Sequence, residues 1–214
     1  METFPQAFNS IVPRINNIVI NSGEKMEGNL FYFHHHNLNS TQDFHKPFAP
    51  KRKQIVEVTK DVKHILEIGF NAGHSAALML TNHPNLKYSA IDICMHKYTE
   101  PCAALMKQEF GNRFAFFKGD SARAYPFNFR EFYDCDMVHI DGGHSLEMFR
   151  IDTLNAIFLP RNPNIVRHLL IDDVDLPEVR DELKRFCNEG YLRIVQPEGF
   201  NSTHHVLCEI IWKP

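Results

Sequence analysis

The chain has 214 residues, of which 43% are hydrophobic and 23% charged, so it suits one domain with a substantial core better than two average domains. A formal charge of −3 and a single short basic cluster, at 51–53, argue against a nucleic-acid or membrane partner. Five cysteines without a C-x-x-C pair, and no apolar stretch of membrane-spanning length, favour a cytoplasmic protein with free thiols.

Residues 1–50 differ in composition from the rest of the chain. They are rich in Asn, His, Phe and Pro, and their four prolines limit regular structure. The pattern of 12–20 leaves a short strand and a helix equally open. We therefore divide the chain into an N-terminal extension, 1–50, and a main domain, 51–214. The extension is expected to act as a lid or an assembly segment, and because lids often pair, a homodimer is plausible.

From residue 51 onward, short apolar runs alternate with helical patterns, which is typical of buried parallel strands joined by helical crossovers. The expected strands are 64–68, 87–93, 113–118, 137–140 and 166–171. The expected helices are 53–62, 74–80, 100–110, 145–158 and 177–188. The basic cluster is interpreted as the solvated start of a helix. The segment 121–136 is expected to be irregular, with room for one helical turn. The last two runs, 192–196 and 205–212, have no helix between them and are predicted to pair antiparallel at the sheet edge. The pattern predicts an α/β fold with a doubly wound, mostly parallel sheet.

Each of the five parallel strands ends on or close to an acidic residue. These acids are Glu67, Asp92, Asp120, Asp141 and the pair Asp172 and Asp173. In an open α/β sheet, ligands bind outside the carboxyl ends of the strands. A row of acids along that edge predicts a polar, positively charged ligand, and this is the main reason to expect an enzyme.

A glycine turn follows the first strand. Gly69 and Gly73 would let the backbone pass close to a ligand, and Ser75 with the first amides of the next helix would face it. The turn lacks the G-x-G-x-x-G spacing that brings a pyrophosphate to a helix N-terminus. Glu67 lies where it would repel such a group, so a ligand without phosphates is favoured.

These motifs resemble those of the class I S-adenosylmethionine-dependent methyltransferases. The E-I-G-x-x-x-G-x-S turn is similar to their first motif, and I-D-G-G-H-S at 140–145 is similar to an I-D-G-x-H motif of some small-molecule O-methyltransferases. The resemblance covers about 55–212 and implies a seven-stranded Rossmann-like sheet with the closing antiparallel pair. It implies that Asp92 holds the ribose hydroxyls and that Asp120 and Ser121 contact adenine. Asn71 departs from the family, where a further glycine is common, but Asn tolerates left-handed backbone.

The full set of expected S-adenosylmethionine contacts is Glu67, Gly69, Asn71, Gly73, His74, Ser75, Asp92, Asp120, Ser121 and Asp141. For Asp120 and Ser121, helix capping is the alternative. For Asp92, it is a solvated strand end.

Three of the acids are candidates for a metal site. Asp141 follows the fourth strand, and Asp172 and Asp173 follow the fifth, so their carboxylates are expected to converge and to repel one another unless a cation lies between them. Oxygen ligands of this kind favour Mg²⁺, and the resemblance to metal-dependent O-methyltransferases implies an ion at the same positions. The alternative is that Asp173 or Asp175 caps the helix at 177–188.

His144 lies three residues after Asp141, at the start of a predicted helix. A neutral imidazole with a pKa near 6.5 can take a proton from a substrate hydroxyl at physiological pH, and the resemblance implies a catalytic histidine at this spacing. His144 and Asp141 are the two residues expected at the reacting atoms. The alternative is a capping or structural histidine.

The predicted activity is methyl transfer from S-adenosylmethionine to a hydroxyl of a small molecule, with Mg²⁺ as a second cofactor. The chain contains no Pro-Pro pair, and the Asp/Asn-Pro-Pro-aromatic motif that many amino-group methyltransferases carry is therefore absent. Two alternative functions are a nicotinamide-dependent oxidoreductase, which the glycine spacing disfavours, and a non-catalytic nucleotide-binding module, for which acids at every strand end would serve no purpose.

Overall fold

A computed structural model describes residues 2–33, 44–143, 145–195 and 205–212. The strands are β1 His64–Ile68, β2 Lys87–Asp92, β3 Phe114–Lys118, β4 Met137–Ile140, β5 His168–Ile171, β6 Leu192–Ile194 and β7 Val206–Ile210. They form one seven-stranded sheet in the order β3-β2-β1-β4-β5-β7-β6. The first five strands are parallel, while β7 pairs antiparallel with both β5 and β6. The predicted fold class and the antiparallel closing pair are confirmed.

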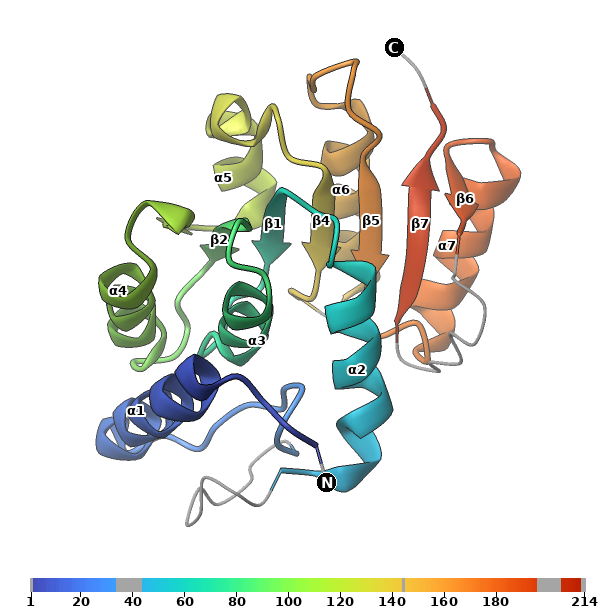
Figure 1. Cartoon of the computed structure of the whole chain (residues 1–214). Helices are drawn as coiled ribbons and strands as arrows, with labels where there is room; N and C mark the ends of the chain where they lie inside the picture. Colours follow the sequence, from blue (N-terminus) through green and yellow to red (C-terminus); the bar gives the residue numbers. More distant parts are fainter. Residues whose placement is uncertain (1, 34–43, 144, 196–204, 213–214) are drawn as a thin grey trace.

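Helices cover both faces of the sheet (Figure 1). They are α1 Gln6–Ser22, α2 Ala49–Val58, α3 His74–Asn82, α4 Thr99–Phe110, α5 Ser121–Phe127, α6 Leu146–Phe158 and α7 Pro177–Asn188. Side chains alternate across each strand, so Ile65 packs in the core with α1 to α4, whereas Leu66 packs in the core with α5 to α7. None of the helices in the described ranges has the length and apolar character needed to span a membrane.

The N-terminal segment is more regular than its prolines indicate. Pro13 lies inside α1, where it removes one helical hydrogen bond. The apolar residues of α1 recur at helical spacing and are at most 2% exposed; they are Phe8, Ile11, Val12, Ile15 and Val19. Burial of this stripe against α3 and α4 outweighs the lost bond, and a helix therefore forms where the pattern of 12–20 alone did not decide.

Two further elements differ from the prediction. Helix α2 begins at Ala49, four residues before the predicted start, because Pro50 suits the first turn of a helix. The segment after β3, expected to be mostly irregular, contains α5 and a 3₁₀ turn at Phe129–Phe132. The carboxylate of Asp120 caps α5 by accepting a hydrogen bond from the amide of Ala122 at 3.0 Å.

Buried polar groups attach the N-terminal segment to the main domain. The side chain of Asn16 in α1 contacts the ring of His74 in α3, with 2.9 Å between Oδ1 and Nε2, and donates to the hydroxyl of Tyr32 at 2.8 Å. Arg52 is 1% exposed and donates to the carbonyl oxygen of Leu30 at 2.8 Å. Buried bonds of this kind stabilise one arrangement of the segment because their separation would leave polar groups without partners.

The neutral form of His74 is part of this attachment. Burial lowers the pKa of His74 to about 3, and the contact to Asn16 Oδ1 fits a proton on Nε2. Because the folded pKa lies below the unfolded value, the stabilisation is present above pH 6.5 and is lost as the pH falls toward the folded pKa.

We therefore expect His74→Gln to reduce the acid sensitivity of folding. Between pH 7 and pH 5 the wild type should lose about 2 kcal/mol more unfolding free energy than the variant. Urea denaturation at several pH values measures this difference. Parallel stability curves for the two proteins would contradict the assignment of a neutral, buried imidazole.

Candidate functional site

A cavity of about 540 Å³ opens at the carboxyl ends of β1, β2, β3 and β4. Its walls include the turn 68–75, the acids Asp92, Asp120 and Asp141, and the segment Glu27 to Asn29 that follows α1. This volume lies within the usual range for small-ligand sites. Of the predicted cofactor contacts, the cavity is lined by Gly69, Asn71, Gly73, His74, Ser75, Asp92, Asp120, Ser121 and Asp141.

The turn after β1 has positive φ at three residues and approaches β4 closely. Gly69, Asn71 and Gly73 have φ values of 96°, 54° and 80°, in the left-handed region. A Cβ atom on Gly69 would lie 2.0 Å from the carbonyl oxygen of Asp141, so only glycine fits there. A Cβ atom on Gly73 would lie 2.4 Å from the ring of Phe70, so Gly73 is required by packing inside the turn and not by the cavity.

Asp92 is held by two backbone amides. Its Oδ2 accepts a hydrogen bond from Asn71 at 2.8 Å, and its Oδ1 accepts one from Cys94 at 2.6 Å. These bonds fix the orientation of the carboxylate at the end of β2, and each oxygen keeps a further lone pair for a ligand. Asn71 adopts a left-handed conformation, and its amide donates to Asp92. Asparagine therefore serves at this position without the glycine that is common in the resembled family.

The segment Glu27 to Asn29 forms a wall that sequence reasoning missed. The hydroxyl of Tyr98 donates to Asn71 Oδ1 at 2.8 Å and accepts from the amide of Glu27 at 3.3 Å, which ties the segment to the glycine turn. The carboxylate of Glu27 lies 3.0 Å from the ring of His96, another cavity residue. No local sequence pattern marks these residues, because they meet only through the packing of α1.

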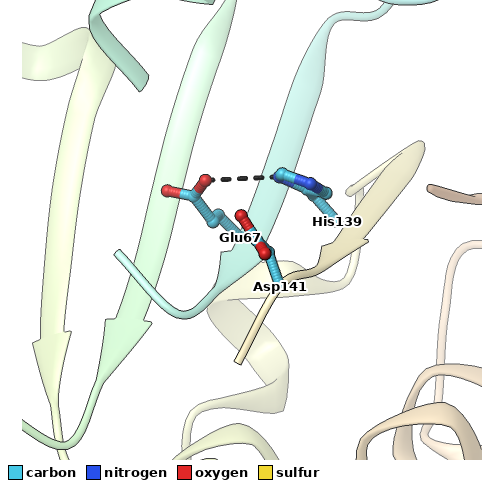
Figure 2. A group of neighbouring side chains, drawn as sticks. All are labelled: Glu67, His139 and Asp141. Atoms are coloured by element: carbon cyan, nitrogen blue, oxygen red, sulfur yellow. Dashed lines mark ion pairs between the residues drawn. The ribbon is translucent and has the colours of Figure 1, made fainter. Parts of the chain in front are cut away.

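Glu67 is not among the residues that line the cavity, and it lies on the same side of β1 as Ile65, which packs in the core with α2 and α3. Residues Glu67 and His139 are partners in the register of β1 and β4, and both are at most 1% exposed. Figure 2 shows their side chains facing each other, with 3.2 Å between Oε1 and Nδ1. Burial raises the pKa of Glu67. Burial lowers the pKa of His139, but Glu67 and Asp141 outweigh that effect and raise it overall.

Asp141 lies beside this pair (Figure 2). One donor atom each from Glu67, His139 and Asp141 falls within 4.8 Å of the others, so the three could hold a metal ion. One imidazole and two carboxylates suit Mn²⁺ or Zn²⁺ better than Mg²⁺. Only Asp141 belongs to the magnesium site that the sequence predicted.

At the predicted magnesium site, a lysine already bonds one of the expected ligands. Lys51 Nζ donates to Asp172 Oδ1 at 2.7 Å and to Oδ2 at 2.5 Å. The amide of Asp173 also donates to Asp172 Oδ1, at 2.8 Å. The ammonium of Lys51 thus already supplies a positive charge at Asp172, and magnesium at the three aspartates stays a prediction from the sequence. Of the basic cluster 51–53, interpreted as a solvated helix start, only Lys53 is exposed.

The ion pair determines the charge of these groups. Burial disfavours the charged form of Asp172, yet Lys51 and His139 outweigh it and lower the pKa of Asp172. Burial and the neighbouring Asp172 raise the pKa of Asp141 well above its usual value. The alternative in which Asp173 or Asp175 caps α7 is not supported, because Leu176 occupies the N-cap position of that helix without a side-chain bond. His144 lies outside the described residues.

We expect Gly69→Ala to destabilise the protein beyond the ordinary strain of a left-handed residue. Gly190→Ala is the matched control, because Gly190 has a φ of 79° and nothing within 4 Å of an added Cβ atom. The control should lose roughly 1–2 kcal/mol of unfolding free energy. Gly69→Ala should lose about 2 kcal/mol more, because its Cβ atom meets the Asp141 backbone. Urea denaturation of both variants measures this, and equal losses would contradict the close approach.

Comparisons with known proteins give a family match for part of the chain and a fold match for nearly all of it. Residues 66–163 match a family described as a methyltransferase domain. No curated protein matches the chain in sequence. The O-methyltransferase TomG of Streptomyces achromogenes, solved in complex with SAM, superposes with a TM-score of 0.63 at 15% identity, over 99% of this chain and 91% of its own.

Two further structures show the same fold. The SAH-bound methyltransferase PaMTH1 of Podospora anserina has a TM-score of 0.63 at 11% identity, with 100% of this chain and 90% of that chain covered. An O-methyltransferase of Bacillus cereus in complex with SAH has a TM-score of 0.59 at 12% identity, with coverage of 95% and 91%. Residues 66–163 thus match a methyltransferase domain, and the chain shares its fold with these solved methyltransferases.

Proposed function

We propose that the protein transfers the methyl group of S-adenosylmethionine to a hydroxyl oxygen of a small molecule. The observation that carries the proposal is the Asp92 carboxylate, held by two amides in the wall of a cavity beside a glycine turn. A carboxylate fixed in this way can accept hydrogen bonds from two neighbouring hydroxyls, as a ribose presents them. The family match over residues 66–163 supports the same cofactor.

The charge of the cavity also supports this cofactor. Glu27, Asp92, Asp120 and Asp141 line the cavity, and no lysine or arginine is among its described lining residues. Opposite charges attract across such a space, so a sulfonium is favoured and a pyrophosphate is repelled. The nicotinamide-dependent alternative is therefore not favoured. In this proposal Asp120 and Ser121, at the start of α5, contact the adenine, and the turn 69–75 surrounds the rest of the nucleoside.

Methyl transfer of this kind is a single displacement. The acceptor oxygen attacks the methyl carbon in line with the sulfur, the carbon–sulfur bond breaks, and the sulfur keeps the electron pair. Holding the two reactants in line contributes roughly 7–11 kcal/mol. Asp141 lines the cavity and also lies beside the buried side chains of Glu67 and His139. It is proposed to lie next to the reacting atoms.

The acceptor oxygen must also lose its proton. His144 stays the proposed base on the strength of its place three residues after Asp141 in the sequence. Magnesium at Asp141, Asp172 and Asp173 is not part of this proposal, because Lys51 bonds both oxygens of Asp172. A small hydroxylated acceptor is part of it. A homodimer and a cytoplasmic setting stay predictions from the sequence.

Calorimetry tests the cofactor. S-adenosylhomocysteine should bind to the wild type, whereas NAD⁺ should give no heat of binding. Asp92→Ala should weaken S-adenosylhomocysteine by about 100-fold, because two hydrogen bonds to a charged acceptor are lost. Asp61→Ala, which removes an exposed carboxylate, should leave the affinity unchanged. Binding of NAD⁺ in place of S-adenosylhomocysteine would end the proposal.

The base is tested separately, with an acceptor found by screening hydroxylated metabolites. His144→Ala should slow turnover at neutral pH by roughly 10²–10⁴-fold and should leave the calorimetric affinity for S-adenosylhomocysteine within two-fold, since the proposal gives this residue no cofactor contact. Equal turnover of the variant and the wild type would reduce His144 to a structural role.

A further inference from the structure

Helix α2 places a positive charge at the acidic edge of the sheet. It runs past the carboxyl ends of β4 and β5 (Figure 1), and Lys51 in its first turn reaches the carboxylate that follows β5. The side chain of Lys51 is 16% exposed and that of Asp172 is 3% exposed. This ion pair is therefore almost entirely removed from water, unlike the exposed pairs that contribute little.

The ammonium interacts with more than one carboxylate. Burial by itself would lower the pKa of Lys51, but Asp172, Asp141 and Asp173 together raise it. These are the same three acids that were expected to surround a divalent cation. All three carboxylates thus favour the charged form of one ammonium group.

A divalent ion and this ammonium exclude each other at Asp172. A hard divalent cation binds carboxylate oxygens at roughly 2.0–2.6 Å, and Lys51 Nζ already lies 2.7 Å and 2.5 Å from the two oxygens. Two cations so close together would repel strongly in a buried site. We infer that Lys51 takes the place of a divalent cation at this site, and that the protein transfers methyl groups without a metal bound to Asp172.

The role of this charge in catalysis rests on the proposed function. A cation among acids stabilises the negative charge that develops on an acceptor oxygen as its proton leaves. Lys51 supplies a fixed positive charge beside Asp141, which lines the cavity. Two of its three N–H donors go to Asp172, and no other bond from Nζ occurs within the described part of the chain. We therefore treat Lys51 as a positioning residue.

Glu67, His139 and Asp141, which could hold a metal ion, form a second possible cation site. It shares Asp141 with the lysine site but does not include Asp172. An ion bound there would not depend on Asp172, and this difference allows the two sites to be distinguished by substitution of Asp172 alone.

The experiment measures Mn²⁺ binding to the full chain by calorimetry. Lys51→Ala should bind Mn²⁺ at least ten-fold more tightly than the wild type, because the carboxylates lose their cation. The double variant with Lys51→Ala and Asp172→Asn should lose that gain. Lys53→Ala removes an exposed positive charge from the same helix and should behave as the wild type. Far-ultraviolet circular dichroism and the affinity for S-adenosylhomocysteine confirm that each variant is folded.

Several outcomes would overturn the inference. One is Mn²⁺ binding to the wild type that Asp172→Asn weakens, since the ion would then displace the ammonium. Another is a folded Lys51→Ala variant that gains no affinity for Mn²⁺. If that variant does not fold, Lys51→Gln, which keeps a hydrogen-bonding group without the charge, is measured in its place.

A further measurement needs no variant. Turnover of the wild type with an identified acceptor should change less than two-fold in EDTA, and a loss of ten-fold or more that Mn²⁺ restores would contradict the inference. Absence of S-adenosylhomocysteine binding would remove the proposed function and the catalytic role of the charge. The Mn²⁺ titrations would still test whether Lys51 takes the place of a divalent cation at Asp172.

Discussion

The close approach of the glycine turn to the end of β4 is the constraint on which the cavity depends. A side chain at Gly69 would meet the carbonyl oxygen of Asp141 at 2.0 Å, so the two walls of the cavity are in direct contact at their base. The backbone ladder continues across this contact, since the amide of Asp141 donates to the carbonyl oxygen of Ile68 at 2.9 Å. Movement of either wall would therefore break both packing and hydrogen bonds.

The N-terminal segment completes the cavity because its own polar groups bond to the turn. Tyr98 connects the amide of Glu27 to the side chain of Asn71, whose amide in turn holds Asp92. The buried contact of Asn16 with His74 attaches α1 to the helix that starts at this turn. The Asp92 carboxylate and a segment more than sixty residues earlier thus belong to one hydrogen-bonded unit, and its parts order one another.

Two buried ion pairs lie near the carboxyl ends of the parallel strands. Glu67 and His139 balance each other between β1 and β4, and Lys51 balances Asp172 after β5. Asp141 lies between them with its pKa raised by burial and by Asp172. A buried carboxylate without a partner is costly, and the fold places His139 of β4 beside Glu67 and Lys51 of α2 beside Asp172. Of Glu67, Asp141 and Asp172, it is Asp141 that lines the cavity.

The sequence by itself determined the parallel strands, the antiparallel closing pair and the glycine turn, because these depend on local periodicity and on backbone conformations that few residues adopt. It also placed Asp92, Asp120 and Asp141 at one edge, since strand polarity alone brings strand ends together. Only the tertiary structure decided that α1 forms despite Pro13, that Glu27 lines the cavity, and that Lys51 rather than open space faces Asp172. Those outcomes come from contacts between residues far apart in the chain, where burial and charge pairing outweigh local preference and no short pattern records the partner.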